Sequence, residues 1–99
     1  MSQFLPIKVI VTVSGGAGQT LFGTNGGQCL GMTVKVPSDI PTYDVELWDL
    51  ESFPHFGAIG ASGTSYFPAN LQLWDKQTIY IANATADGIY QVKLWVKPY

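Results

Sequence analysis

The chain has 99 residues and a formal net charge of −2, with 46% hydrophobic and only 12% charged residues. A chain of this length forms one domain with a modest core, so residues 1–99 are expected to be a single domain without a disordered part. No apolar run approaches the roughly 20 residues that cross a bilayer. Residues 1–6 lack the basic and apolar regions of a signal peptide, which predicts cytoplasmic synthesis and no membrane partner.

The five basic residues are all lysines, spread along the chain, and there is no arginine. Without arginine the chain lacks the planar fork that recognises phosphate or guanine with two hydrogen bonds. Its negative net charge also gives no counterion-release drive toward nucleic acid. Nucleic acid is therefore not an expected partner.

The first strand is predicted at residues 7–13, where apolar side chains alternate after Pro6. Residues 14–28 hold six glycines and predict a long turn or a loosely paired hairpin. Alternation resumes over residues 30–36 until Pro37 ends that strand. Residues 43–48 predict a third strand with an acidic outer face.

Residues 52–70 form the least regular stretch, which we expect to be an irregular connection with a short strand near residues 64–67. The runs at 71–81 and 89–96 flank Asp87-Gly88 and predict two strands paired antiparallel. In the second run Tyr90 and the apolar residues at alternate positions after it share one face, which we assign to the core.

These elements predict an all-β fold: a small antiparallel β-sandwich of six or seven strands, immunoglobulin-like or jelly-roll-like, with a small β-barrel as the alternative. Residues 86–92, with the sequence Ala-Asp-Gly-Ile-Tyr-Gln-Val, resemble the tyrosine corner of immunoglobulin-like sandwiches. The resemblance covers about seven residues and implies that the Tyr90 hydroxyl bonds to backbone upstream. It also places Val92 where antibody domains carry a cysteine.

Few residues suit catalysis or metal binding. Cys29 is expected to be a small buried hydrophobe and His55 a loop residue packed among aromatics, since neither has the partners of a nucleophile or a base. One His and one Cys cannot form a usual zinc site. The carboxylates between Asp44 and Glu51 lack the loop of a calcium site, so a solvated acidic strand face is favoured over calcium. We therefore expect no enzyme activity, no cofactor and no metal.

The aromatic residues are the better candidates for function. Trp48, Trp74 and Trp95 lie at positions opposite in parity to the apolar rows of their strands, so they point outward and are covered by loops, by a protein partner or by a sugar. The irregular stretch adds further rings. The predicted interface residues are Phe53, Phe56, Tyr66, Phe67, Trp48 and Trp95.

As a whole the chain resembles small all-β accessory proteins of tailed bacteriophages, in its glycine-rich loops, few charges, single cysteine and lack of arginine. This resemblance implies a non-enzymatic virion component, synthesised in the cytoplasm and assembled into the virion, that decorates or cements the capsid. Its partners would be other virion proteins or copies of itself. The alternative is a carbohydrate-binding or host-adhesion module that uses Trp48, Trp95 and Tyr66 as stacking platforms for glycans.

Overall fold

The computed structural model describes residues 5–23, 26–37, 41–49, 53–73 and 76–97. These residues form eight strands and no helix: β1 (Leu5–Val13), β2 (Gly18–Gly23), β3 (Gly27–Lys35), β4 (Thr42–Trp48), β5 (Pro54–Ser62), β6 (Ser65–Leu73), β7 (Lys76–Ala82) and β8 (Gly88–Lys97). Because helices are absent from the described part of the chain, none of it could cross a membrane as a long apolar helix.

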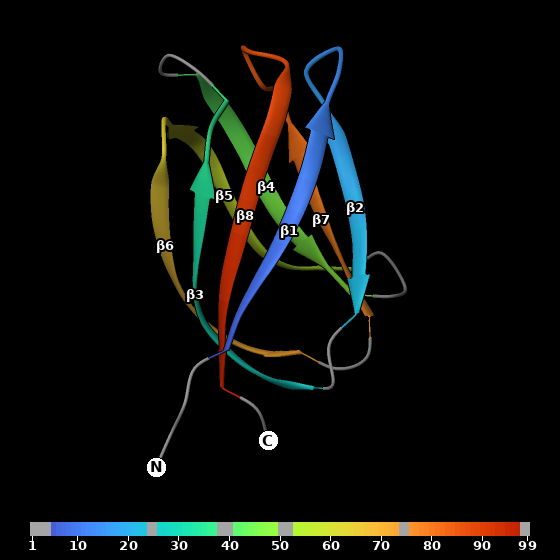
Figure 1. The fold of residues 1–99 in the computed structure, drawn as a ribbon, viewed down its shortest axis with the longest axis vertical. Coiled ribbons are helices and arrows are strands. Elements are labelled where there is room, and N and C mark those ends of the chain that lie inside the picture. The colour runs from blue at the N-terminus through green and yellow to red at the C-terminus, as the bar shows by residue number, and fades with distance from the viewer. Residues whose placement is uncertain (1–4, 24–25, 38–40, 50–52, 74–75, 98–99) are drawn as a thin grey trace.

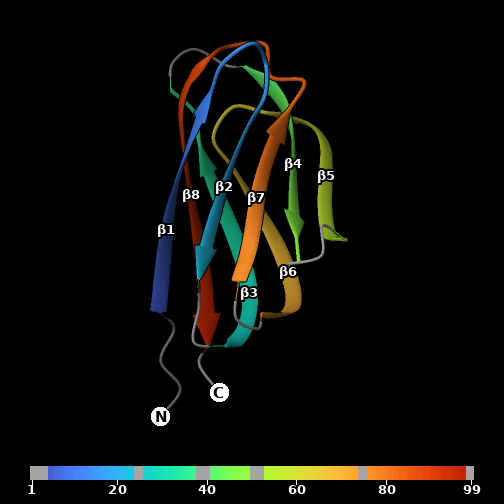
Figure 2. The same ribbon diagram turned by 90° about the vertical axis from the view of Figure 1, so that its right-hand side faces the viewer.

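The strands form two four-stranded antiparallel sheets that pack face to face (Figures 1 and 2). Sheet I has the order β1-β8-β3-β6 and sheet II the order β2-β7-β4-β5. The pairing is nested, since β1 pairs with β8, β2 with β7, β3 with β6 and β4 with β5.

This nested order is that of a jelly roll. The predicted all-β sandwich is confirmed, with eight strands in place of six or seven. The barrel alternative is wrong because each sheet is open, with two edge strands, and the strand order differs from that of immunoglobulin domains.

The core lies between the sheets and follows from strict alternation along the strands. In β4 the inward residues are Tyr43, Val45 and Leu47, and in β8 they begin with Tyr90 and Val92. All of these were assigned to inward faces by the sequence. Strand β3 departs from simple alternation at a bulge between Cys29 and Gly31, which brings Cys29 into the core in place of Leu30.

The tyrosine corner is present although the sandwich is a jelly roll. The Tyr90 hydroxyl donates a 2.7 Å hydrogen bond to the Ala86 carbonyl oxygen, as the resemblance implied. The Tyr90 ring is buried and meets Tyr43 edge to face, with centroids 5.5 Å apart. Burial raises the pKa of the Tyr90 hydroxyl, and the charge of Asp87 adds to this rise.

The glycine-rich stretch differs from its prediction because it contains a complete strand. The chain turns at Gly15-Gly16, both with positive φ, and β2 then joins sheet II by pairing with β7. The Asp87 carboxylate accepts hydrogen bonds from the backbone N–H groups of Gly15 and Gly16, at 3.1 and 3.0 Å. This clamp ties the β1–β2 turn to the loop before β8.

Two other expectations about strand pairing are wrong. Residues 71–81 do not form one strand paired with 89–96: residues 71–73 end β6, and residues 76–81 belong to β7 in sheet II, whereas β8 lies in sheet I. The stretch 52–70, expected to be irregular apart from a short strand near residues 64–67, holds β5 and most of β6, so the short strand is confirmed as part of β6 and the irregular connection is wrong. Its inward positions in β5 include the small side chains Ala58 and Ala61, which give a weak hydrophobic alternation in the sequence.

Proline occurs in three of the four edge strands of the described fold: Pro6 in β1, Pro54 in β5 and Pro68 in β6. A proline has no N–H to offer an added strand, so these edges are protected against edge-to-edge pairing. Strand addition is therefore disfavoured at three of the four edges, which leaves the outer sheet faces as candidate surfaces for a partner.

Candidate functional site

The six predicted interface residues lie in different parts of the sandwich. Trp48 is on the outer face of sheet II, whereas Trp95 and Tyr66 are on the outer face of sheet I. Phe53 precedes β5 and is 64% exposed. Phe56 and Phe67 are on the inward faces of β5 and β6.

Phe56 and Phe67 close one side of the sandwich from within. Both are partly buried and pack on the core, and their rings meet at 6.3 Å between centroids and 64° between planes. This contact joins the edge strand of sheet II to the edge strand of sheet I. Neither ring lies on an outer sheet face, so the surface sites are built without them.

The outer face of sheet II carries an aromatic stack. Trp48 in β4 and Tyr80 in β7 lie with ring centroids 4.8 Å apart and planes inclined by 22°. The Trp48 Nε1–H donates a 2.5 Å hydrogen bond to the Glu46 carboxylate, which fixes the indole against the sheet. Leu21, 57% exposed, lies in the same row as Trp48, with Thr78 between them. We call the surface formed by Leu21, Trp48 and Tyr80 the aromatic face.

The sequence did not point to Tyr80 or Leu21 as members of this surface. The signal for Tyr80 was present, because it has the parity opposite to the buried Ile79 and Ile81. Leu21 was obscured by the glycines around it, which hid the strand that carries it. Only the pairing of β2, β7 and β4 brings the three side chains together.

The acidic side chains of β4 serve structural contacts. The Asp44 carboxylate accepts hydrogen bonds from the Gly60 backbone N–H at 2.8 Å and the Asn83 side-chain amide at 2.7 Å. The Asn83 bond, followed by the Gly60 bond, lowers the pKa of Asp44. No group of three potential metal ligands occurs among the described residues, and Glu51, the last member of the sequence cluster, lies outside them.

Cys29 and His55 belong to strands. Cys29 is fully buried in β3, and burial raises the pKa of its thiol, which keeps it in the less reactive protonated form. This confirms the expectation of a small buried hydrophobe. His55 belongs to β5 and not to a loop.

Two aromatic residues and a glycine form a second surface feature, on the outer face of sheet I. Gly31 pairs with Trp95 of β8, and the Tyr66 ring from β6 covers Gly31 so closely that a Cβ there would lie 2.2 Å from the Tyr66 hydroxyl oxygen. The Tyr66 ring thus occupies the space that a side chain at position 31 would fill, and a larger residue there would displace the ring. Of the three residues named as stacking platforms for glycans, Trp95 and Tyr66 therefore share the outer face of sheet I, and Trp48 lies on the outer face of sheet II.

Comparisons of the chain with protein-family models, with characterised proteins and with solved structures gave no match. The side chains on the two outer sheet faces are therefore the basis for a proposed function.

Proposed function

We propose that the protein is a non-enzymatic structural subunit that acts by assembly, as a component of a tailed-bacteriophage virion that decorates or cements the capsid. The observation that carries this proposal is the aromatic face, a stacked Trp48–Tyr80 pair beside the exposed Leu21 on an open sheet. Aromatic side chains are enriched in protein interfaces, and exposed apolar surface of this kind marks a place of contact.

The geometry of the aromatic face suits a protein partner. The stack is held to the sheet by the bond from Trp48 to Glu46, so little side-chain freedom is lost when a partner covers it. Rigid aromatic residues at the centre of an interface supply much of its binding energy. The aromatic face is therefore expected to be the anchor, with polar neighbours forming the rim.

The edge strands of the two sheets and the acidic residues also favour a structural role over an enzymatic one. Prolines in three edge strands disfavour strand addition and leave the outer faces for assembly. Two well-placed carboxylates, Asp44 and Asp87, are bound to backbone or amide N–H groups that hold loops together. Their hydrogen bonds suit structural roles better than acid–base catalysis.

The genes beside the coding sequence provide the first test. Capsid and tail genes would support a virion component, whereas genes for polysaccharide degradation would support the alternative of a carbohydrate-binding or host-adhesion module. Where capsid genes are found, capsids assembled from them are the appropriate partner for a co-sedimentation assay.

Leu21→Ser tests the aromatic face in that assay. It removes an exposed apolar side chain from the aromatic face, and we expect it to weaken attachment to capsids, or self-association, by roughly tenfold. Ile89→Ser is the matched control, because Ile89 is 51% exposed on the outer face of the other sheet. Equal losses in both variants, or no loss in Leu21→Ser, would contradict the proposed anchor.

A further inference from the structure

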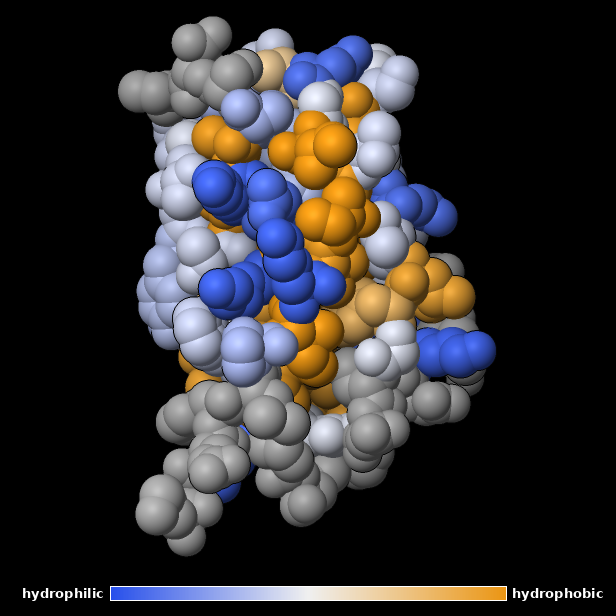
Figure 3. Space-filling view, in the orientation of Figure 1, coloured by the Kyte–Doolittle hydropathy of each residue, from blue (hydrophilic) through white to orange (hydrophobic). Residues whose placement is uncertain are grey.

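The fold gathers lysines that are scattered in the sequence. Lys8 of β1, Lys35 of β3 and Lys93 of β8 all lie on the outer face of sheet I, and Lys97 follows on the same face of β8. Lys93 is directly opposite Lys8 in the β1–β8 register, and Lys35 is opposite Gln91 in the next row. Figure 3 shows this side of the molecule, with hydrophilic side chains gathered in the middle and hydrophobic ones beside them.

The described residues of this face include no carboxylate to balance the lysines. The outward positions of β1, β8, β3 and β6 are otherwise neutral, and the described acidic residues are on β4 or in loops. Like charges directly opposite each other destabilise a sheet, so we expect repulsion between Lys8 and Lys93 to lower the stability of the fold. An anion bound between these ammonium groups would remove that repulsion.

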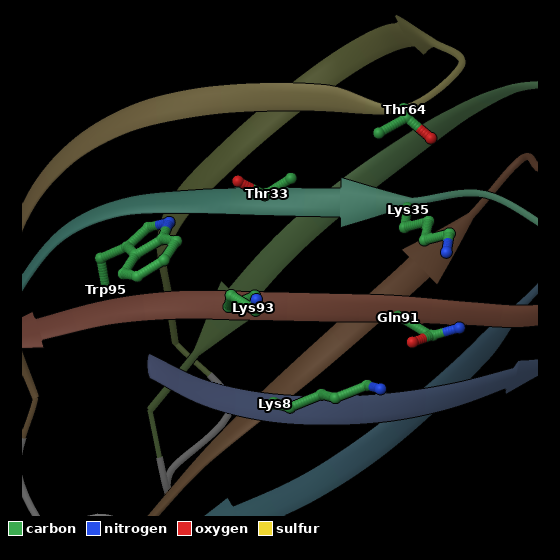
Figure 4. A pocket seen from close by; sticks show the side chains of 7 residues that line it. All are labelled: Lys8, Thr33, Lys35, Thr64, Gln91, Lys93 and Trp95. Atoms are coloured by element: carbon green, nitrogen blue, oxygen red, sulfur yellow. The ribbon is translucent and has the colours of Figure 1, made fainter. Parts of the chain in front are cut away.

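The lysines surround a shallow depression of about 370 Å³. Its lining comes from three neighbouring strands and the β5–β6 turn: Lys8, Thr33, Lys35, Thr64, Gln91, Lys93 and Trp95 (Figure 4). The Lys93 ammonium lies 5.3 Å from the centroid of the Trp95 ring. A volume of this size is within the range of small-ligand sites.

The combination of groups selects a ligand class. Three ammonium groups attract an anion, and the threonine hydroxyls and the Gln91 amide can bond to ligand hydroxyls. The Trp95 ring, which has the Lys93 ammonium over one face, adds an apolar side to the depression. A sugar ring with a carboxylate or sulfate substituent presents all three kinds of partner within a few ångströms. A phosphate chain alone would leave the ring and the neutral polar groups without a role.

We propose that this depression, the lysine site, binds an acidic saccharide, with its anionic group among Lys8, Lys35 and Lys93 and its sugar ring beside Trp95. The proposal adds a ligand to the assembly role and does not depend on it, because the aromatic face is on the other sheet. An experiment can therefore contradict glycan binding at the lysine site without contradicting assembly through the aromatic face, and the reverse also holds.

Isothermal titration with oligogalacturonate tests the lysine site. We expect saturable binding to the wild type, and a loss of roughly tenfold or more in affinity when Lys8→Gln and Lys93→Gln are combined. Lys76→Gln is the control, because Lys76 begins β7 in the other sheet, and it should bind as the wild type does. Equal losses in the control, or no binding to the wild type, would overturn the proposal.

Other probes identify the class of ligand. Neutral galactose oligomers, inorganic phosphate and a single-stranded oligothymidine should each bind more weakly than oligogalacturonate. Tighter binding of oligothymidine would assign the site to nucleic acid and overturn the proposal, as would equal binding of neutral galactose oligomers or phosphate. Trp95→Ala should weaken oligogalacturonate binding while leaving the weak binding of phosphate unchanged.

Gln91→Glu tests the lysine site with a variant that is expected to stay folded, so weaker binding could not be attributed to unfolding. It places a carboxylate opposite Lys35 within the depression, so we expect a higher melting temperature together with weaker oligogalacturonate binding. A variant that is more stable and still binds as the wild type does would contradict the proposed position of the ligand anion.

Discussion

Phe56 and Phe67 illustrate at the scale of single residues how a fold decides the role of an aromatic side chain. Their stretch of sequence looked like a loop with exposed rings, yet both rings lie between the sheets. Trp48 and Trp95 were correctly expected to point outward, since their parity in clearly alternating strands gave the direction. Alternation along a strand shows which rings point outward only where the strand itself can be recognised in the sequence. In β5 the glycine and alanine residues hid this alternation.

The Phe56–Phe67 contact leads to a prediction about stability. Combining Phe56→Ser with Phe67→Ser removes two partly buried rings between the sheets, and we expect a loss of at least about 3 kcal/mol in the free energy of unfolding. Urea denaturation followed by Trp fluorescence measures this loss. Phe53→Ser is the control, since Phe53 is 64% exposed and should change stability little. Unchanged stability in the double variant would place these rings at the surface after all.

At the scale of elements, the sequence predicted the strands with strong alternation and failed where pairing depends on distant segments. The inward faces of β1, β4 and β8 agree with the alternation of valine, leucine and tyrosine. The partners of β7 and β8 could not be read from the Asp87-Gly88 turn, because a turn between strands does not say whether the chain stays in one sheet. Here the chain crosses between sheets, and the Asp87 clamp on Gly15 and Gly16 holds that crossing.

Asp44 is a second link between elements, and it predicts a dependence of stability on pH. Its carboxylate joins β4 to the bulge in β5 and to the residue after β7, and these bonds lower its pKa in the folded state. A group with a lowered folded pKa stabilises the fold above its unfolded pKa, about 4 for aspartate. That contribution is lost as the pH falls through the lower, folded pKa.

Asn83→Gly tests this link. It removes the amide that bonds to Asp44 while allowing the positive φ of 50° at this position. We expect the pKa of Asp44, followed by carboxyl NMR shifts, to rise toward its ordinary value and the acid-dependent loss of stability to become smaller. Asn70→Gly in β6 is a control for general effects of the substitution. A pKa of Asp44 that stays low in Asn83→Gly would assign the shift to Gly60 instead.

At the scale of the whole molecule, the sandwich separates two kinds of surface. Sheet II presents the aromatic face, and sheet I presents the lysine site. No alternation or motif in the sequence revealed this division, since the lysines are far apart in the chain and only the register of β1, β8 and β3 unites them. The net charge of −2 therefore conceals a local concentration of positive charge on sheet I.

The division predicts that salt acts differently on the two surfaces. Raising the ionic strength from about 0.01 M to about 1 M shortens the Debye length from roughly 30 Å to roughly 3 Å, which weakens attraction between exposed charges. We expect oligogalacturonate binding at the lysine site to fall steeply over this range. Association through the aromatic face should change little, since apolar contact does not depend on screening. Titrations and sedimentation of one protein sample at several salt concentrations measure both. If association fell as steeply as oligogalacturonate binding, the partner would be held by the lysines, and the aromatic face would lose its role as the anchor.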